Sequence, residues 1–348
     1  MTSVRLRHEP PYAQPIGDHR RTAVRLSTRR ATTMLLGCLL LVAGCSPSEW
    51  GADGPRLRIM VPNVAGGGYD ATARTAAAIV QRAGVVDDRI AVFNLDGDGG
   101  TVALRRLIAE RGNGDLAMVM GLGVVGATVT VHGSGQVTEA TPIARLIEEP
   151  EAVLVPARSR YHSIGELITV WRADPARLSI GGGSAAGGPD HLMSMRLAQA
   201  AGIDPVRVRY LPFDGGGDLL PALLDERIEV AVSSVVEYSA QIRSGQLRVL
   251  AVSGPARLPG VDAPTLTEAG FDLVFTNWRG VLAPPGISDS DRDRLVRLLN
   301  RLHHTPEWNA AVARIGWTNA FLPGEEFGVF LADQERDVRE MLTKLGLA

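Results

Sequence analysis

The residues of this chain best suited to chemistry are glycines, which gather in four clusters directly after apolar runs. The clusters read NVAGGGYD (63–70), NLDGDGGT (94–101), GGGSAAGGPDH (181–191) and LPFDGGGD (211–218). Because glycine has no side chain, backbone N–H groups can come close to a ligand, and a helix N-terminus adds free donors and a positive dipole end. The clusters therefore predict an anion cradle, with tight strand-to-helix turns as the simpler alternative. In the first cluster, Ala65 to Gly68 would approach the anion and Asp70 would cap the helix behind it.

Known nucleotide-binding loops fit these clusters poorly. None of the four reads GxxxxGK followed by Ser or Thr, and the single lysine, Lys344, lies near the C-terminus. None of the four reads GxGxxG, since GDGGTV ends in Val102. A P-loop ATPase and a dinucleotide-binding enzyme are therefore disfavoured.

A catalytic serine is the competing interpretation of the third cluster. GGSAA (182–186) differs by one residue from the nucleophile elbow GxSxG of esterases, with Ala186 in place of the second glycine. Asp262 and then His303 or His304 follow Ser184 in the order that a hydrolase triad requires. Order alone is weak support, so we favour a binding protein and expect no enzymatic activity. We expect no metal and no cofactor, because the sequence has no HExxH motif and no cysteine after Cys45.

The composition is that of a folded protein with a substantial core. The chain has 348 residues, of which 45% are hydrophobic and 21% charged, enough for two lobes rather than one. The formal net charge is −2 at pH 7, and the part after residue 44 is more acidic, because the first 44 residues hold seven arginines and two acids. The basic footprint of a nucleic-acid-binding protein is absent from this composition.

The first 44 residues have the pattern of an export signal. Basic residues up to Arg30 precede the apolar run MLLGCLLLVAG (34–44), which is too short for a stable membrane span. Small residues lead to Cys45, which resembles the lipidated cysteine of bacterial lipoprotein signals. We therefore expect a signal peptide over 1–44, a lipid on Cys45, and a tether over 45–55. The protein would be exported and anchored on the extracytoplasmic face of the cell membrane. An ordinary signal peptide is the alternative, and Sec and twin-arginine export both stay open.

Strand and helix patterns alternate along the rest of the chain. Fully apolar runs, typical of strands buried on both faces, cover 56–62, 90–94, 115–121, 151–156, 177–183, 229–234 and 248–254. Helical patterns cover 70–84, 101–111, 163–174, 190–202, 217–226, 288–305 and 324–346. This alternation predicts an α/β fold of two lobes, each a mostly parallel sheet flanked by helices. In such sheets ligands bind at the carboxyl ends of the strands, where the glycine clusters lie.

An ordered set of motifs resembles the substrate-binding receptor of the tripartite tricarboxylate transporters, the Bug receptor family. The resemblance covers 56–348, and its motifs are VPNVAGGGYDATAR, VFNLDGDGG, TPIARLIEEPEAVLVP, LSIGGGSAAGGPDHL, VRVRYLPFDGGGD, GQLRVLAVSG, APTLTEAGFDLVFTNWRGVLAPPGIS and PGEEFGVFLADQERDVREML. It implies a type II-like periplasmic binding protein that closes about a hinge with two crossings. We expect lobe 1 to comprise 56–155 and the returning segment 266–348, and lobe 2 to comprise 156–265.

The resemblance also implies a function and partners. The ligand would be a small organic carboxylate, such as a di- or tricarboxylate, held between the lobes and passed to the membrane subunits of the transporter. We expect a monomer, without nucleic-acid partners. A sensor that presents its loaded form to a signalling partner would share the fold and stays open as an alternative.

The site residues follow from the resemblance position by position. The ligand would be bound by two main loops, by a histidine inside the helix after the second loop, and by the start of the fourth cluster. These residues are Ala65, Gly66, Gly67, Gly68, Tyr69 and Asp70, then Gly183, Ser184, Ala185, Ala186, Gly187 and Gly188, then His191, Phe213 and Asp214. His191 could equally be a packing residue, and Asp70 is expected to cap its helix rather than touch a carboxylate.

Two positions depart from the family pattern. Relatives usually carry Phe-Pro-Pro before the glycines of the first loop, where this chain has Asn63, Val64 and Ala65. They usually carry a lysine after the aromatic residue of the fourth loop, where this chain has Asp214. A negative side chain there would disfavour highly charged anions, so the resemblance does not point to citrate in particular.

Overall fold

Alternating strands and helices form the chain from Leu57 onward, as the apolar runs predict. The computed structural model describes residues 57–85, 89–213 and 215–348, which fall within one unit, Gly54–Ala348. The predicted signal peptide, Cys45, the tether and Asp214 lie outside the described residues.

The described elements match most of the predicted ones. The strands are β1 (Leu57–Val61), β2 (Ile90–Asn94), β3 (Leu116–Gly121), β4 (Thr141–Pro156), β5 (Ser179–Gly182), β6 (Arg209–Pro212), β7 (Val230–Ser234), β8 (Leu247–Val252), β9 (Thr276–Ala283) and β10 (Thr318–Pro323). The helices are α1 (Gly68–Arg82), α2 (Thr101–Ala109), α3 (Leu122–Thr130), α4 (Ile164–Ala173), α5 (Pro189–Ala200), α6 (Gly216–Leu224), α7 (Ser239–Arg243), α8 (Asp289–His303), α9 (Pro306–Ile315) and α10 (Gly324–Lys344). The sequence patterns missed the helices α3, α7 and α9, the strands β6, β9 and β10, and the first ten residues of β4.

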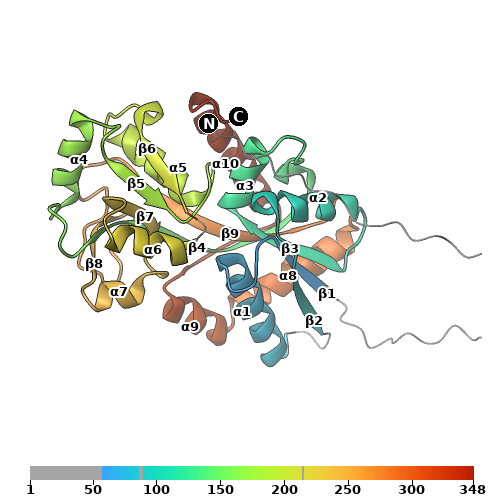
Figure 1. Cartoon of the computed structure of the whole chain (residues 1–348). Helices are drawn as coiled ribbons and strands as arrows, with labels where there is room; N and C mark the ends of the chain where they lie inside the picture. Colours follow the sequence, from blue (N-terminus) through green and yellow to red (C-terminus); the bar gives the residue numbers. More distant parts are fainter. Residues whose placement is uncertain (1–56, 86–88, 214) are drawn as a thin grey trace, which may run out of the picture. The chain divides into compact units, whose positions relative to one another are not determined.

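The strands form two groups that share β4. In the first group β1 pairs in parallel with β2 and β3, and β9 pairs antiparallel with β3 and β4. In the second group β5 pairs in parallel with β6 and β7. The strand β4 pairs antiparallel with β9 and β10 up to Pro150, and with β7 and β8 from Glu151 onward. Figure 1 shows β4 and β9 running between the two groups.

The expectation of mostly parallel sheets is wrong, although the α/β class and the two lobes are confirmed. Parallel pairing occurs where a helix returns the chain to the same edge, as in β1–α1–β2. The strand that crosses between the two groups, β4, pairs antiparallel with β9 and β10 in the first group and with β7 and β8 in the second. The sheets are therefore mixed, because the chain crosses between lobes along extended strands.

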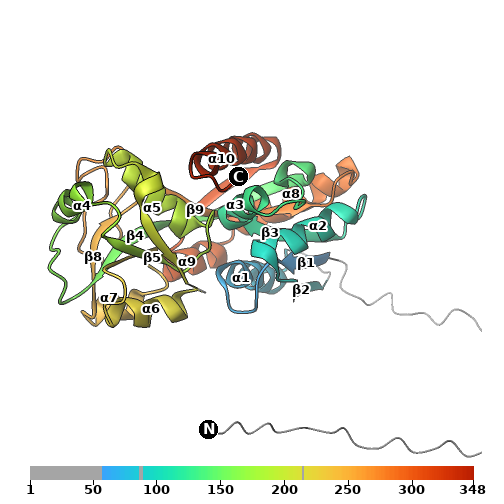
Figure 2. The ribbon, with the colours of Figure 1, turned by 45° about the horizontal axis from the view of Figure 1, so that its top comes forward.

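Helices cover both faces of each group of strands, which explains the fully apolar runs. Ile59 of β1 packs in one core with α1, α8 and α9, whereas the next residue, Met60, packs with α2, α3 and α10 on the opposite face. In the second group, α4 and α5 contribute to one core, and α6 contributes to the other. Figure 2 shows α10 lying beside α3, on the face away from α1. In the described part of the chain, no helix has the length and apolarity needed to cross a membrane.

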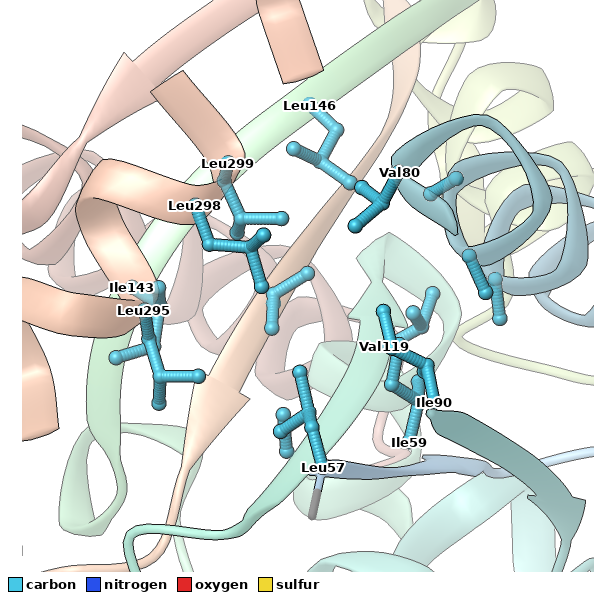
Figure 3. Close-up of a pocket in the computed structure, with 15 residues that line it drawn as sticks. Leu57, Ile59, Val80, Ile90, Val119, Ile143, Leu146, Leu295, Leu298 and Leu299 are labelled. Atoms are coloured by element: carbon cyan, nitrogen blue, oxygen red, sulfur yellow. The ribbon is translucent and has the colours of Figure 1, made fainter. Parts of the chain in front are cut away.

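A small cavity of about 30 Å³ lies within the first of these cores (Figure 3). Its walls are side chains of β1, β3, α1 and α8, including Leu57, Val80, Val119 and Leu295. The volume is roughly that of one water molecule, and the lining is entirely apolar, so a water there would have no hydrogen-bond partners. This cavity is a packing gap and has none of the polar groups that a carboxylate needs.

Candidate functional site

A cleft of about 890 Å³ lies between the two groups of strands, and residues of all four glycine clusters line it. The first two clusters come from β1 and β2 in the first group of strands, and the last two come from β5 and β6 in the second. The cluster residues that line the cleft include Gly66, Gly68, Gly97, Gly99, Gly100, Gly183, Ser184, Ala185, Ala186, Gly188 and Gly215. Strand ends far apart in sequence thus present their loops to one shared cavity.

Six of the residues that the sequence assigned to the site do not line the cleft. Tyr69 lines the cleft together with the cluster residues above. Asp214 lies outside the described residues. The remaining six do not belong to the cleft lining, and they are Ala65, Gly67, Asp70, Gly187, His191 and Phe213.

Asp70 supports the first loop from behind. It is not the N-cap of α1, as the sequence suggested, because Gly67 occupies that position and Asp70 lies within the first helical turn. Its Oδ2 accepts a hydrogen bond from the Gly66 N–H at 2.9 Å, and Arg74 and Asn94 donate to the same carboxylate. Burial opposes ionisation, but these donors outweigh it and lower the pKa of Asp70. The carboxylate therefore fixes the loop and is already neutralised by Arg74.

The second loop repeats the backbone geometry of the first. Gly66 and Gly187 have φ of +88° and +87°, a region that favours glycine. The N-caps that follow, Gly67 and Gly188, have φ/ψ of −72°/171° and −74°/170°. The Gly187 N–H donates to Nδ1 of His191 at 3.2 Å, just as the Gly66 N–H donates to Asp70. The two lobes thus hold equivalent loops, a repeat that the differing sequences conceal.

His191 accordingly has the position in α5 that Asp70 has in α1. The ring is 6% exposed and lies edge-on to Tyr210, with ring centroids 4.9 Å apart. Because Nδ1 accepts a hydrogen bond, the proton of the neutral ring resides on Nε2. Burial lowers the pKa of His191 to about 4, so the ring stays neutral near pH 7. Its contacts are those of a loop-supporting residue.

We predict that Asp70→Ala lowers the free energy of unfolding by about 1–2 kcal/mol, because the Gly66 N–H and the Arg74 side chain lose a buried acceptor. Urea unfolding measures this loss, with Asp272→Ala as the control because Asp272 is an exposed acid of a loop. The contribution of Asp70 has a defined pH dependence. Since its folded pKa is depressed, the stabilisation is present above the unfolded pKa and is lost as the pH falls through the folded pKa. Equal stability of the two variants at pH 7 would contradict the prediction.

A fifth glycine motif, which the sequence analysis missed, faces the same cleft. GLGVVG (121–126) follows β3 and opens α3 with the spacing GxGxxG. The Tyr69 hydroxyl lies against the start of α3, where a Cβ at Gly123 would come within 2.9 Å of it, so a phenol occupies the helix N-terminus where a phosphate would bind in a dinucleotide site. Burial raises the pKa of Tyr69, although Arg279 and the backbone of Val124 and Gly123 oppose this effect. The GLGVVG motif therefore holds the Tyr69 side chain in place.

Acidic side chains form another part of the cleft that the sequence analysis missed. Glu149 and Glu151 of β4, Asp190 of α5 and Glu237 all line it. The signal available in the sequence was the run of three glutamates at 148, 149 and 151 in EEPEAVLVP, at the start of an expected apolar strand. Arg279 of β9 forms a buried ion pair with Glu149, and the two side chains are 8% and 3% exposed.

Burial and neighbouring acids raise the pKa of two of these carboxyl groups. Burial raises the pKa of Glu151 well above its usual range, and the charges of Asp190 and Glu149 add to this effect. Burial and the charge of Glu237 raise the pKa of Asp190 to about 8. In the described part of the chain, no group of three or more such side chains is placed to hold a metal ion.

The triad expected for a hydrolase is not assembled around Ser184. The Ser184 Oγ accepts a hydrogen bond from the Asp190 N–H at 3.2 Å. His303 stacks on Phe321 and is hydrogen-bonded to Asn319, and the other two candidates, Asp262 and His304, do not line the cleft with Ser184. Among the residues that the structure describes, Ser184 therefore has none of the expected triad partners in the cleft.

Comparison with known proteins identifies relatives of this arrangement. A family model described as the tripartite tricarboxylate transporter family receptor matches residues 87–347. A UPF0065 protein in the gbd 5′ region of Cupriavidus necator is 24% identical over 297 residues, which cover 84% of this chain and 88% of that protein.

Two solved structures share the fold. MatC from Rhodopseudomonas palustris with bound malate has a TM-score of 0.69 and 21% identity, and the match covers 83% of this chain and 99% of MatC. R. palustris Rpa4515 with adipate has a TM-score of 0.73 and 20% identity, and the match covers 85% and 99% of the two chains. Both comparisons agree with the two-lobed α/β arrangement described above.

Proposed function

The chain belongs to the receptor family of the tripartite tricarboxylate transporters, and we propose that it captures a small organic carboxylate in the cleft and delivers it to the membrane subunits of such a transporter. The observation that carries this proposal is the convergence of four glycine clusters, from both groups of strands, on one cleft. MatC and Rpa4515, which share the fold, hold the carboxylates malate and adipate.

Backbone donors of the first loop would hold the carboxylate. The helix α1 starts at Gly68 with no side-chain cap, and the first N–H groups of a helix have no carbonyl partner within it. The amides of Gly68 and Tyr69 therefore offer donors at the positive end of the α1 dipole. Asp70 does not oppose an anion strongly here, because Arg74 neutralises it.

Closure of the two lobes would enclose the ligand. We assign the described residues of 57–150 and 276–348 to lobe 1 and those of 151–252 to lobe 2, with crossings in β4 at Pro150–Glu151 and in the segment 253–275. This division places the first crossing earlier than the sequence suggested, because β4 changes its pairing partners at Glu151. Ser253 links the two crossings, since its hydroxyl accepts from the Glu151 N–H and donates to the Phe275 carbonyl.

Calorimetry with a panel of mono-, di- and tricarboxylates tests the binding function. We expect saturable binding of at least one acid, and Ser184→Ala should keep the fold and weaken binding only modestly. Absence of binding across the panel, together with an esterase turnover that Ser184→Ala abolishes, would instead establish the hydrolase. Uptake of the bound acid by cells, lost on deletion of the gene and restored by its return, tests delivery to the membrane subunits.

Export and anchoring complete the proposed function, with Cys45 as the lipid attachment site. Replacing Cys45 by serine removes the thiol that would carry the lipid, so we predict that Cys45→Ser moves the protein from the membrane fraction to a soluble one. Immunoblotting of fractionated cells measures this distribution. An unchanged membrane fraction would argue against a lipid on this residue.

A further inference from the structure

The charged side chains around the cleft are predominantly acidic, which is unexpected for a site that takes only anions. Among the described residues that line it, six are acidic and one is basic, and these are Asp96, Asp98, Glu149, Glu151, Asp190, Glu237 and Arg279. The single basic residue, Arg279, is engaged in the buried ion pair with Glu149. Arg279 therefore neutralises Glu149, Arg105 pairs with Asp98, and Ser233 donates to Glu237, whereas Glu151 and Asp190 have no ion-pair partner among the described residues.

Glu151 has no charged partner for either oxygen. The residue is 0% exposed, and neither Oε1 nor Oε2 has a donor in hydrogen-bonding geometry among the described residues, although the nearby Asn277 amide partly offsets the effect of burial on its pKa. Asp190 is 6% exposed, and the Gly183 backbone beside it only partly offsets the effect of burial on its pKa. No described arginine, lysine or histidine forms an ion pair with either residue. Buried carboxyl groups without a partner are strongly unfavourable, so a missing partner of positive charge would complete this corner of the cleft.

The two equivalent loops differ at the second residue of the helix that follows each loop, and this residue determines whether a negative or a positive ligand group is favoured there. Tyr69 is the second residue of α1, and Asp190 is the second residue of α5. The α1 end of the cleft thus has a neutral phenol and free amides, whereas the α5 end has a carboxyl group beside Glu151. The first end suits an anion and the second a cation.

Building on the proposed function, we propose that the ligand is an amino carboxylic acid, whose carboxylate binds the α1 loop and whose positively charged nitrogen binds Glu151 and Asp190. The two ends of the cleft then each meet a group of opposite charge. A ligand without the nitrogen would leave both buried acids without a partner.

The groups that face Glu151 set the expected pH dependence. They are the carboxyl groups of Glu149, Asp190 and Glu237, the Asn277 amide, the phenols of Tyr210 and Tyr238, and the Arg279 guanidinium that pairs with Glu149. Burial and the neighbouring acids raise the pKa of Glu151 and Asp190, so the empty site holds protons near pH 7. A bound ammonium group favours the ionised acids and displaces those protons. Binding should therefore release protons, and affinity should rise with pH from 6 to 8.

Matched pairs of ligands test the proposal by calorimetry on the purified protein. Each amino acid is compared with the acid of the same carbon skeleton that lacks the nitrogen: aspartate with succinate, 4-aminobutyrate with butyrate, and 5-aminopentanoate with pentanoate. We expect at least one amino acid to bind 10-fold or more tightly than its partner acid. In Glu151→Gln this ratio should fall to within about 3-fold, whereas the control Glu340→Gln, at an exposed acid of α10, should keep it.

The same titrations in two buffers of different ionisation enthalpy count the protons exchanged. Proton release by the amino acid supports the proposal. Proton uptake, with affinity falling as pH rises, would overturn it, because the acids would then act as neutral donors to a carboxylate. If Glu151→Gln does not fold, Asp190→Asn and the wild-type proton count decide the matter.

The outcomes separate the two proposals. Nitrogen-free acids that bind as tightly as the amino acids would overturn the zwitterion proposal and leave the carboxylate receptor in place. Absence of binding by every acid and amino acid would remove both.

Discussion

Replacing Arg279 by methionine is expected to lower the free energy of unfolding by about 3–5 kcal/mol. Arg279 of β9 and Glu149 of β4 form an ion pair in which both side chains are almost fully buried. Removing the guanidinium leaves the Glu149 carboxylate in a poorly solvated place, with the Ser234 hydroxyl as its remaining hydrogen-bond donor. The large effect comes from this uncompensated charge rather than from the intrinsic strength of the pair.

Arg279 also connects elements that build the cleft. Its guanidinium lies 5.4 Å from the centre of the Trp317 ring and donates to the Thr72 hydroxyl of α1 at 3.4 Å. A methyl group at Gly68, the first residue of α1, would come within 2.6 Å of the same guanidinium. Arg279→Met should therefore loosen the N-terminus of α1 as well as the contact between β4 and β9.

Urea unfolding at pH 7 measures the loss, and the double variant Glu149→Gln with Arg279→Met is the control. Because the double variant leaves no buried charge, it should recover much of the lost stability. A single variant within 1 kcal/mol of the wild type would show that Glu149 is readily solvated or protonated.

Replacing Gly126 by alanine is expected to weaken ligand binding by about 100-fold, which corresponds to roughly 2.7 kcal/mol. Gly126 belongs to α3, a helix that packs on the first group of strands. A Cβ at Gly126 would lie 1.8 Å from the carbonyl oxygen of Gly187, which belongs to the loop before α5 in the other lobe. Both sides of this contact are backbone, so no side-chain rotation can relieve the clash. The two lobes could then no longer reach the arrangement seen here.

Gly165→Ala is a matched control for Gly126→Ala. Gly165 lies in α4, and the nearest atom to a Cβ there is the Ser163 hydroxyl at 3.9 Å. Alanine in place of glycine favours a helix by about 1 kcal/mol, so neither variant should lose secondary structure. Calorimetry gives the affinities, and small-angle X-ray scattering shows whether ligand still compacts the protein. Unchanged affinity in Gly126→Ala would mean that the ligand-bound form does not need this contact.

Local patterns in the sequence determined much of the fold. Fully apolar runs between helical segments predicted an α/β protein, and the position of glycine clusters after strands predicted loops at one edge of each sheet. These inferences succeed because strand burial and strand-to-helix turns depend on residues close together in the chain. The ordered motifs also identified the receptor family, which the comparison confirmed over residues 87–347.

Other features depended on contacts between distant segments. Glu149 and Arg279 are 130 residues apart and meet because β4 and β9 pair antiparallel in a particular register. Whether Asp70 and His191 face the ligand or support the loops depended on the direction of each side chain at its helix start. The mixed sheets and the Gly126–Gly187 contact also required the assembled chain.

The sequence by itself determined that glycine-rich strand ends exist and which family they belong to, because those properties are local. Only the tertiary structure decided that these loops face one cleft, and that Glu151 and Asp190, which have no ion-pair partner among the described residues, line the same cleft as the start of α1. The physical reason is that the charge environment of a side chain is set by whichever segments pack against it, and strand register rather than nearby sequence brings those segments together.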